Sequence, residues 1–205
     1  MDTNGESTCA GKKIRASMQM FSHDLLDGCI MFAELAKKAQ SENKIRCYNT
    51  ACIFFATSSI EAKINEWISI AQACYKDEPK SFCHSLAPLV KKLTLSEKWN
   101  LIAANENGTL WDKSKEPFQS YELIISLRNE LTHYKGQFLE KGGAPNRKIK
   151  DLMNRFGIKG KSKFVEDDTY SWVHDLLSCR ELGKWIASRI IKFDNSILAL
   201  WNSIT

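Results

Sequence analysis

Apolar residues recur every three or four positions along most of the chain, which is the spacing of one face of an α-helix. The clearest stripe predicts a helix over residues 47–74, and similar stripes predict helices over 16–39 and 117–136. A fourth helix, capped by Asp167 or Asp168, is expected to run almost to the C-terminus. Because each helix must bury its apolar face, the four together predict an all-α fold, an antiparallel four-helix bundle.

Weaker helical signals lie between the main stripes. Residues 81–104 predict two short helices, the first interrupted by Pro88 and the second opened by a capping box of Thr94 and Glu97. A further short amphipathic helix is expected over 149–156. These segments are interpreted as embellishments of one bundle.

The N-terminal residues 1–15 are polar and predict a disordered tail, so residues 16–205 are expected to form a single helical domain. This domain carries insertions at about 77–116 and 135–167. The tail has no hydrophobic run of the kind found in secretory signals, and no apolar stretch in the chain reaches roughly 18 residues. We therefore expect a cytoplasmic protein that does not contact membranes.

The cysteine and histidine spacing argues against a metal site. Seven cysteines are present, an odd number without any C-x-x-C pair, which favours reduced thiols used as small apolar groups. His23, His84 and His174 lie far apart in the sequence, and no H-x-x-x-H pattern occurs. With no glycine-rich phosphate loop after a strand either, we expect no cofactor.

Positive charge is concentrated in one part of the chain. The formal net charge is +5, but residues 141–164 hold eight basic residues and one acid, so the remainder is slightly acidic. A local basic region attracts an anionic partner, although it can also be a solvated loop without a partner. The residues proposed to make that contact are Lys135, Arg147, Lys148, Lys150, Arg155, Lys159, Lys161 and Lys163.

One arginine stands on an apolar helical row. Arg128 follows Tyr121 and Ile125 by seven and three residues, which places a charge on the inward side of its helix. Such a charge is costly unless it is paired or faces a solvated cleft. Glu61 or Asn65 of the 47–74 helix could meet it if the two helices pack together.

A polar strip runs beside that arginine. Asn129 and His133 are four residues apart, one turn above each other, with Ser126 below them and Thr132 adjacent. A histidine there can transfer protons near neutral pH, or it can merely interact with the last carbonyls of the helix.

Two phrases on these helices resemble the HEPN superfamily. The first is S-x-I-E-A-x-I-N-E over residues 58–66, and the second is LRNELTHYKG over 127–136. The family's mark is an arginine, commonly followed by a polar residue, with a histidine shortly after. Here Arg128 and His133 enclose four residues, of which Asn129 is the first. Glu130 also lies inside the motif, about 200° around the helix from Arg128, and is expected to face away from it.

The resemblance implies a helical bundle and, for many members, metal-independent endoribonuclease activity in toxins or antiviral effectors. It assigns phosphate binding to Arg128, proton transfer to His133 and an orienting role to Asn129, with Glu61, Asn65, Ser126 and Thr132 as supporting residues. RNA is then the anionic partner, and a homodimer that pairs two motifs is expected. The alternatives are a non-catalytic dimeric binding module, partnered with an antitoxin or a nucleotidyltransferase, and a helical adaptor outside the family. For Arg128 alone, the alternative is an ion pair with Glu61 that only joins two helices.

Overall fold

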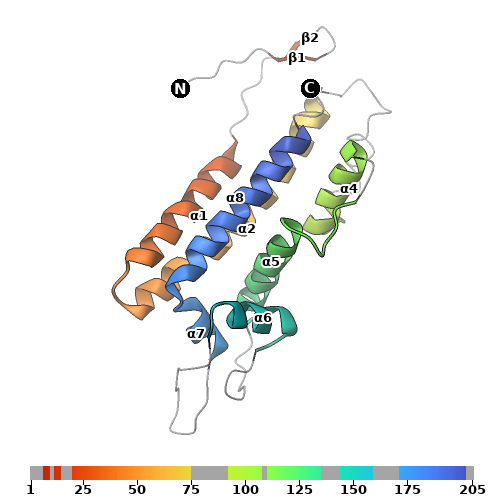
Figure 1. Cartoon of the computed structure of the whole chain (residues 1–205). Helices are drawn as coiled ribbons and strands as arrows, with labels where there is room; N and C mark the ends of the chain where they lie inside the picture. Colours follow the sequence, from red (N-terminus) through yellow and green to blue (C-terminus); the bar gives the residue numbers. More distant parts are fainter. Residues whose placement is uncertain are drawn as a thin grey trace, which may run out of the picture.

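The computed structural model describes residues 7–9, 12–14, 20–74, 92–107, 110–134, 144–158 and 171–201 (Figure 1). Within these ranges the chain forms one short hairpin and seven helices. The hairpin consists of β1 (Ser7–Cys9) and β2 (Lys12–Ile14), antiparallel with Thr8 opposite Lys13. The helices are α1 (Phe21–Lys38), α2 (Glu42–Cys74), α4 (Leu95–Asn107), α5 (Phe118–Thr132), α6 (Arg147–Arg155), α7 (Trp172–Leu177) and α8 (Arg180–Trp201).

The helices pack as a bundle around α2, the longest of them. Helix α1 turns back along α2, and both contact α8 (Figure 1). Helix α5 contacts α2 and α8 as well, while α6 lies against α5 near its C-terminal end (Figure 1). The predicted all-α class is therefore confirmed, and the hairpin lies within the segment that was expected to be a tail. Among the described helices, none is both long and apolar enough to cross a membrane.

The core is rich in aromatic rings where α5, α4 and α8 meet. Tyr121 stacks on Phe193 with 4.1 Å between ring centroids, and Trp99 and Phe118 pack around the same phenyl ring. All four side chains are buried. Full burial of a large apolar side chain contributes about 1.5–3 kcal/mol, so this cluster fixes α5 firmly onto the bundle.

Two polar contacts of α2 reach neighbouring helices through the core. Lys63 forms a buried ion pair with Asp194 of α8. The Glu66 carboxylate accepts hydrogen bonds from the backbone N–H of Ser22, at 2.9 Å, and from the Ser22 hydroxyl, at 2.5 Å. Because Ser22 lies in the first turn of α1, whose amides have no intrahelical partner, Glu66 acts as a cap supplied by another helix.

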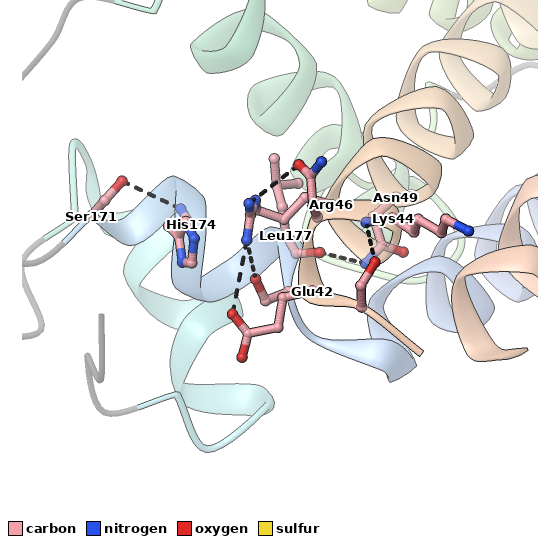
Figure 2. Close-up of polar contacts among 10 residues, drawn as sticks. Glu42, Lys44, Arg46, Asn49, Ser171, His174 and Leu177 are labelled. Atoms are coloured by element: carbon pink, nitrogen blue, oxygen red, sulfur yellow. Dashed lines mark hydrogen bonds and ion pairs between the residues drawn. The ribbon is translucent and has the colours of Figure 1, made fainter. Parts of the chain in front are cut away.

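The last part of the chain differs from the prediction of one long helix. It is divided into α7 and α8, and the carbonyls at the break accept hydrogen bonds from a buried side chain of α2. The Asn49 amide donates to the carbonyl oxygens of Leu177, at 2.7 Å, and Cys179, at 2.9 Å. Figure 2 shows the bond to Leu177 and the Ser171–His174 contact that caps α7. The single-helix prediction was wrong because this side chain satisfies groups that a helix break would otherwise leave unpaired.

Other boundaries can be compared with their predictions. Helix α2 begins at Glu42, five residues earlier than expected. The capping box is confirmed: Thr94 N–H donates to Glu97 Oε2 at 2.7 Å, and Glu97 N–H donates to Thr94 Oγ1 at 3.3 Å. Pro88, with the short helix that was predicted around it, and residues 167–168 lie outside the described residues.

Cys29, Cys47, Cys52 and Cys179 are free thiols. Cys29 and Cys52 are buried with their sulfur atoms 3.6 Å apart, while Cys47 is exposed. Hydrogen bonding between the two buried thiols, together with their burial, raises the pKa of Cys29 well above its ordinary value. These thiols therefore serve as small core groups, in agreement with the prediction.

Candidate functional site

The motif lies on the last two turns of α5. Phe118, Tyr121, Ile124 and Leu127 are buried and hold the inner face of this helix in the core. The helix ends at Thr132, and the backbone N–H of the next residue, His133, donates to the Asn129 carbonyl at 3.0 Å. The polar residues of the motif therefore lie at the C-terminal end of a helix whose inner face is anchored in the core.

Arg128 contacts one of its two predicted partners. Its Nη2 lies 3.7 Å from Glu61 Oε2 on α2, and its Nη1 donates to Asn129 Oδ1 at 3.1 Å. The arginine side chain is 29% exposed and that of Glu61 is 49% exposed. The other candidate, Asn65, instead accepts from Lys98 Nζ of α4 at 3.4 Å. The guanidinium is thus oriented by two acceptors and remains accessible to solvent.

The hydroxyl of Tyr121 is buried and makes no hydrogen bond within the described part of the chain. Burial raises its pKa well above the ordinary value, and the negative charges of Glu122 and Glu61 add to this effect, while Arg128 opposes it. Tyr121 therefore stays neutral near neutral pH and cannot serve as a general base there.

His133 and Asn129 are both exposed. Over the described residues, the imidazole makes neither a hydrogen bond nor an ion pair, so it is available to an incoming group. His133 lies five positions after Arg128, which corresponds to about 140° around a helix, and Asn129 lies between the two in angle. One copy of the chain therefore presents the guanidinium and the imidazole on different strips of α5, joined by Asn129.

The remaining supporting residues do not gather at one point. Thr132 Oγ1 donates to the Arg128 carbonyl at 2.9 Å, so it is engaged with its own helix. Ser126 is half-buried on the strip below Asn129. Among the described residues, Glu61 is the one predicted supporting residue whose side chain contacts a side chain of the motif.

Half of the predicted basic residues lie on α6. Arg147, Lys148, Lys150 and Arg155 are all exposed, and α6 packs directly on α5. The other basic candidates, Lys135, Lys159, Lys161 and Lys163, lie outside the described residues.

Two contacts between α5 and α6 were not predicted from the sequence. The Asn146 amide donates to Glu130 Oε1 at 2.5 Å, and Lys148 Nζ lies 3.5 Å from Glu122 Oε2. Glu130 thus faces α6 and not Arg128, as its helical position predicted. The sequence did contain a signal for these contacts. Asn146 is a residue type suited to N-capping and stands immediately before the basic amphipathic segment that forms α6, while Glu122 and Glu130 are acids on α5.

No group of three or more metal-ligating side chains occurs in the part of the chain that the structure describes. A scan against models of protein families finds no match, and searches of curated proteins and of solved structures find none either.

Proposed function

We propose that this chain is a metal-independent endoribonuclease, of the kind found among toxins and antiviral effectors, whose catalytic residues are Arg128, Asn129 and His133. The observation that carries the proposal is the exposed end of α5. There a solvent-accessible guanidinium, oriented by an amide, lies one strip away from an imidazole without a partner among the described residues.

These groups suit cleavage of RNA by its own 2′-hydroxyl. An imidazole takes the proton from the 2′-hydroxyl, the 2′-oxygen bonds to phosphorus, and the bond from phosphorus to the 5′-oxygen breaks. An imidazolium returns a proton to the departing 5′-oxygen, which leaves a 2′,3′-cyclic phosphate and a 5′-hydroxyl end. Arg128 stabilises the charge on the phosphoryl oxygens with its forked donors.

The contact with Glu61 does not account for Arg128. At 3.7 Å and with both side chains partly exposed, this pair contributes about 0–1 kcal/mol. Helix α5 is already held against the bundle by the buried side chains of Phe118, Tyr121 and Leu127. A weak, solvated partner can be displaced by a phosphate, which is a doubly hydrogen-bonding anion for an arginine. We therefore favour phosphate binding over a purely structural role.

One copy supplies one His133, whereas the reaction needs both a base and an acid. A twofold dimer that pairs the ends of two α5 helices brings a second His133 and a second Arg128 to the same groove. The function is therefore proposed for a homodimer with a composite site in a bundle of the HEPN type, acting in the cytoplasm.

A second candidate is a non-catalytic dimeric module that binds an antitoxin or a nucleotidyltransferase. Five of the seven large apolar side chains exposed in the described ranges belong to α1 and α2, which favours contact with another protein. These are Phe21, Ile30, Met31, Leu35 and Phe54. In this alternative the motif contributes to association and not to chemistry.

Incubation of purified protein with total RNA in EDTA separates the two candidates. The wild type is expected to cleave, and His133→Ala and Arg128→Ala are each expected to lose activity by roughly a hundredfold or more, which is typical for loss of one proton-transfer or charge-stabilising group. Thr132→Ser, which keeps a hydroxyl on the same helix end, is the matched control and should retain activity. Cleavage that survives both alanine variants rejects the motif, and absence of cleavage in every form supports the binding module.

Mixing tests the shared site. Mixed dimers of wild type and His133→Ala carry a single imidazole in the groove. When the wild type is refolded together with an excess of His133→Ala, most wild-type chains enter mixed dimers. The activity per wild-type chain is therefore expected to fall below that of the wild type refolded alone. Activity that simply follows the fraction of wild-type chains would show that each copy acts alone.

A further inference from the structure

Helix α6 has two opposite faces. Ile149, Leu152 and Met153 are buried against the bundle, while Arg147 and Lys150 are exposed on the outer side. Four basic residues and one acid, Asp151, make up the charge of this nine-residue helix. Among the described residues Arg147 pairs with Asp151, at 3.9 Å with both side chains largely exposed, which is a pair of little energetic value.

The position of α6 on α5 is fixed by polar contacts with two acids of the motif helix. Asn146 performs two tasks at once: its Oδ1 accepts from the Ile149 N–H at 3.0 Å, capping α6, and its amide nitrogen donates to Glu130. Lys148 approaches Glu122 within 3.5 Å. The cap of α6 and its attachment to the motif helix therefore depend on the same side chain.

Contacts with α8 fix the other end of α6. The Arg155 guanidinium lies over the Trp185 ring, 5.4 Å from its centroid, and Phe156 packs edge-on against the same indole at 6.0 Å. Since its two ends are held and its inner face is buried, α6 presents its outer cations in one defined orientation relative to α5.

The pairing also changes the charge around the motif. Glu130 directly follows Asn129 in the sequence. Glu122 precedes Asn129 by seven residues and His133 by eleven, and these spacings place all three on the same strip of α5. Unpaired, these two carboxylates would repel a phosphate from that strip. The ammonium of Lys148 compensates the charge of Glu122, and the amide of Asn146 donates a hydrogen bond to Glu130 that directs this carboxylate toward α6.

From this geometry we infer that α6 is an arm that binds the RNA backbone: Arg147 and Lys150 contact phosphates with little sequence preference, and Asn146, through Glu130, positions the arm beside the motif. This inference deepens the proposed function, since it assigns the binding of the substrate backbone to a surface outside the catalytic residues.

Binding to RNA can be measured without cleavage. In the full-length chain carrying His133→Ala, the affinity for a labelled unstructured oligoribonucleotide is determined by fluorescence anisotropy over a series of salt concentrations. Replacement of Arg147 and Lys150 by glutamine is expected to weaken binding roughly tenfold. It should also reduce the slope of log affinity against log salt by about 1.4, because each phosphate that a cation neutralises on single-stranded RNA contributes about 0.7 to that slope. Lys37 and Lys38 are two exposed lysines at the end of α1, and their replacement by glutamine removes the same charge. This control should leave the affinity within about twofold of the starting protein and the slope unchanged.

The positioning role is tested by an exchange of partners. Asn146→Asp keeps an N-cap acceptor for α6 but places a carboxylate against Glu130, and is expected to weaken RNA binding several-fold. In the double variant Asn146→Asp with Glu130→Gln, the glutamine amide can donate a hydrogen bond to the new aspartate. This double variant should therefore recover the RNA binding that the single variant loses. Asn154→Asp is the matched control, because it adds the same charge on the exposed side of α6. Combining it with Glu130→Gln restores the net charge equally, but should not restore RNA binding.

The outcomes separate this inference from the nuclease proposal. RNA binding that depends on Arg147 and Lys150 supports the arm even if the wild type never cleaves RNA. Equal binding by the α6 variant and the α1 control, or an absence of RNA binding, overturns it, even if the wild type proves to be a nuclease. If Glu130→Gln rescues Asn146→Asp and Asn154→Asp equally, the positioning role of Asn146 is overturned, because net charge alone then explains the RNA binding.

Discussion

Removal of Asp194 is expected to destabilise the bundle more than removal of any exposed partner of an ion pair. Its partner Lys63 is 2% exposed, so Asp194→Ala leaves an ammonium group in the core with neither water nor a counter-charge. Loss of one partner of a buried pair costs about 3–5 kcal/mol. For a protein of this length, each kcal/mol lowers Tm by roughly 2–4 °C, so the expected decrease is on the order of 10 °C. Both quantities can be measured by circular dichroism during urea and thermal unfolding.

Two further variants identify the cause. Replacement of both partners, Lys63→Met with Asp194→Leu, removes the charges together and should be neutral or stabilising by about 1–4 kcal/mol relative to the wild type. Lys115→Ala breaks the pair with Asp112 and leaves the hydrogen bonds from Ser114 to Asp112 in place. The two side chains of this pair are 78% and 49% exposed, so the replacement should cost about 0–1 kcal/mol. The reasoning is refuted if Asp194→Ala unfolds within about 1 kcal/mol of the wild type, or if the double replacement is as unstable as the single one.

Two other predictions concern the packing of α8 and the start of α4. A Cβ at Gly183 would lie 2.8 Å from Asn49 Oδ1 and 3.1 Å from Ala33 Cα, so Gly183→Ala should cost about 1–3 kcal/mol in urea unfolding, and an unchanged stability would disprove the close approach. The hydrogen bonds from the Thr94 hydroxyl and backbone hold the pKa of Glu97 below its ordinary value of 4.5. Their stabilisation is therefore complete above pH 4.5 and is lost as the pH falls through the lower, folded-state pKa, so Thr94→Ala should lose less stability on acidification than the wild type. The prediction is contradicted if the free energy of unfolding falls by the same amount on acidification in Thr94→Ala and in the wild type.

The features predicted correctly from the sequence are those whose causes are local. The stripe of Ile53, Ile60 and Ile64 identifies α2 because helical periodicity is visible within one segment. The box of Thr94 and Glu97 spans only four positions, and hydrogen bonds within it are a property of that short stretch. Local causes can be recognised without knowledge of the fold.

Features that depend on distant residues could not be predicted in this way. The break between α7 and α8 is stabilised by Asn49, more than a hundred residues earlier in the chain. Lys63 stands in the phrase that suggested the family, yet nothing next to it indicates a buried lysine, because Asp194 lies 131 residues away. The early start of α2 at Glu42 had no apolar stripe to mark it.

The candidate site was predictable to a similar extent. The contact of Arg128 with Glu61 followed from two helical rows that were each visible in the sequence, once the helices were assumed to pack. The attachment of α6 through Asn146 and Glu130 was not predicted, because it joins two helices across a loop whose path the sequence does not reveal.

The chemistry of the RNA ends tests the central claim most directly. RNA treated with the purified protein in EDTA is analysed for its termini, alongside RNA treated with His133→Ala. The account predicts 2′,3′-cyclic phosphate and 5′-hydroxyl ends that are produced by the wild type and absent with the variant. Ends carrying a 3′-hydroxyl and a 5′-phosphate, or cyclic phosphate formed equally by both proteins, would contradict it.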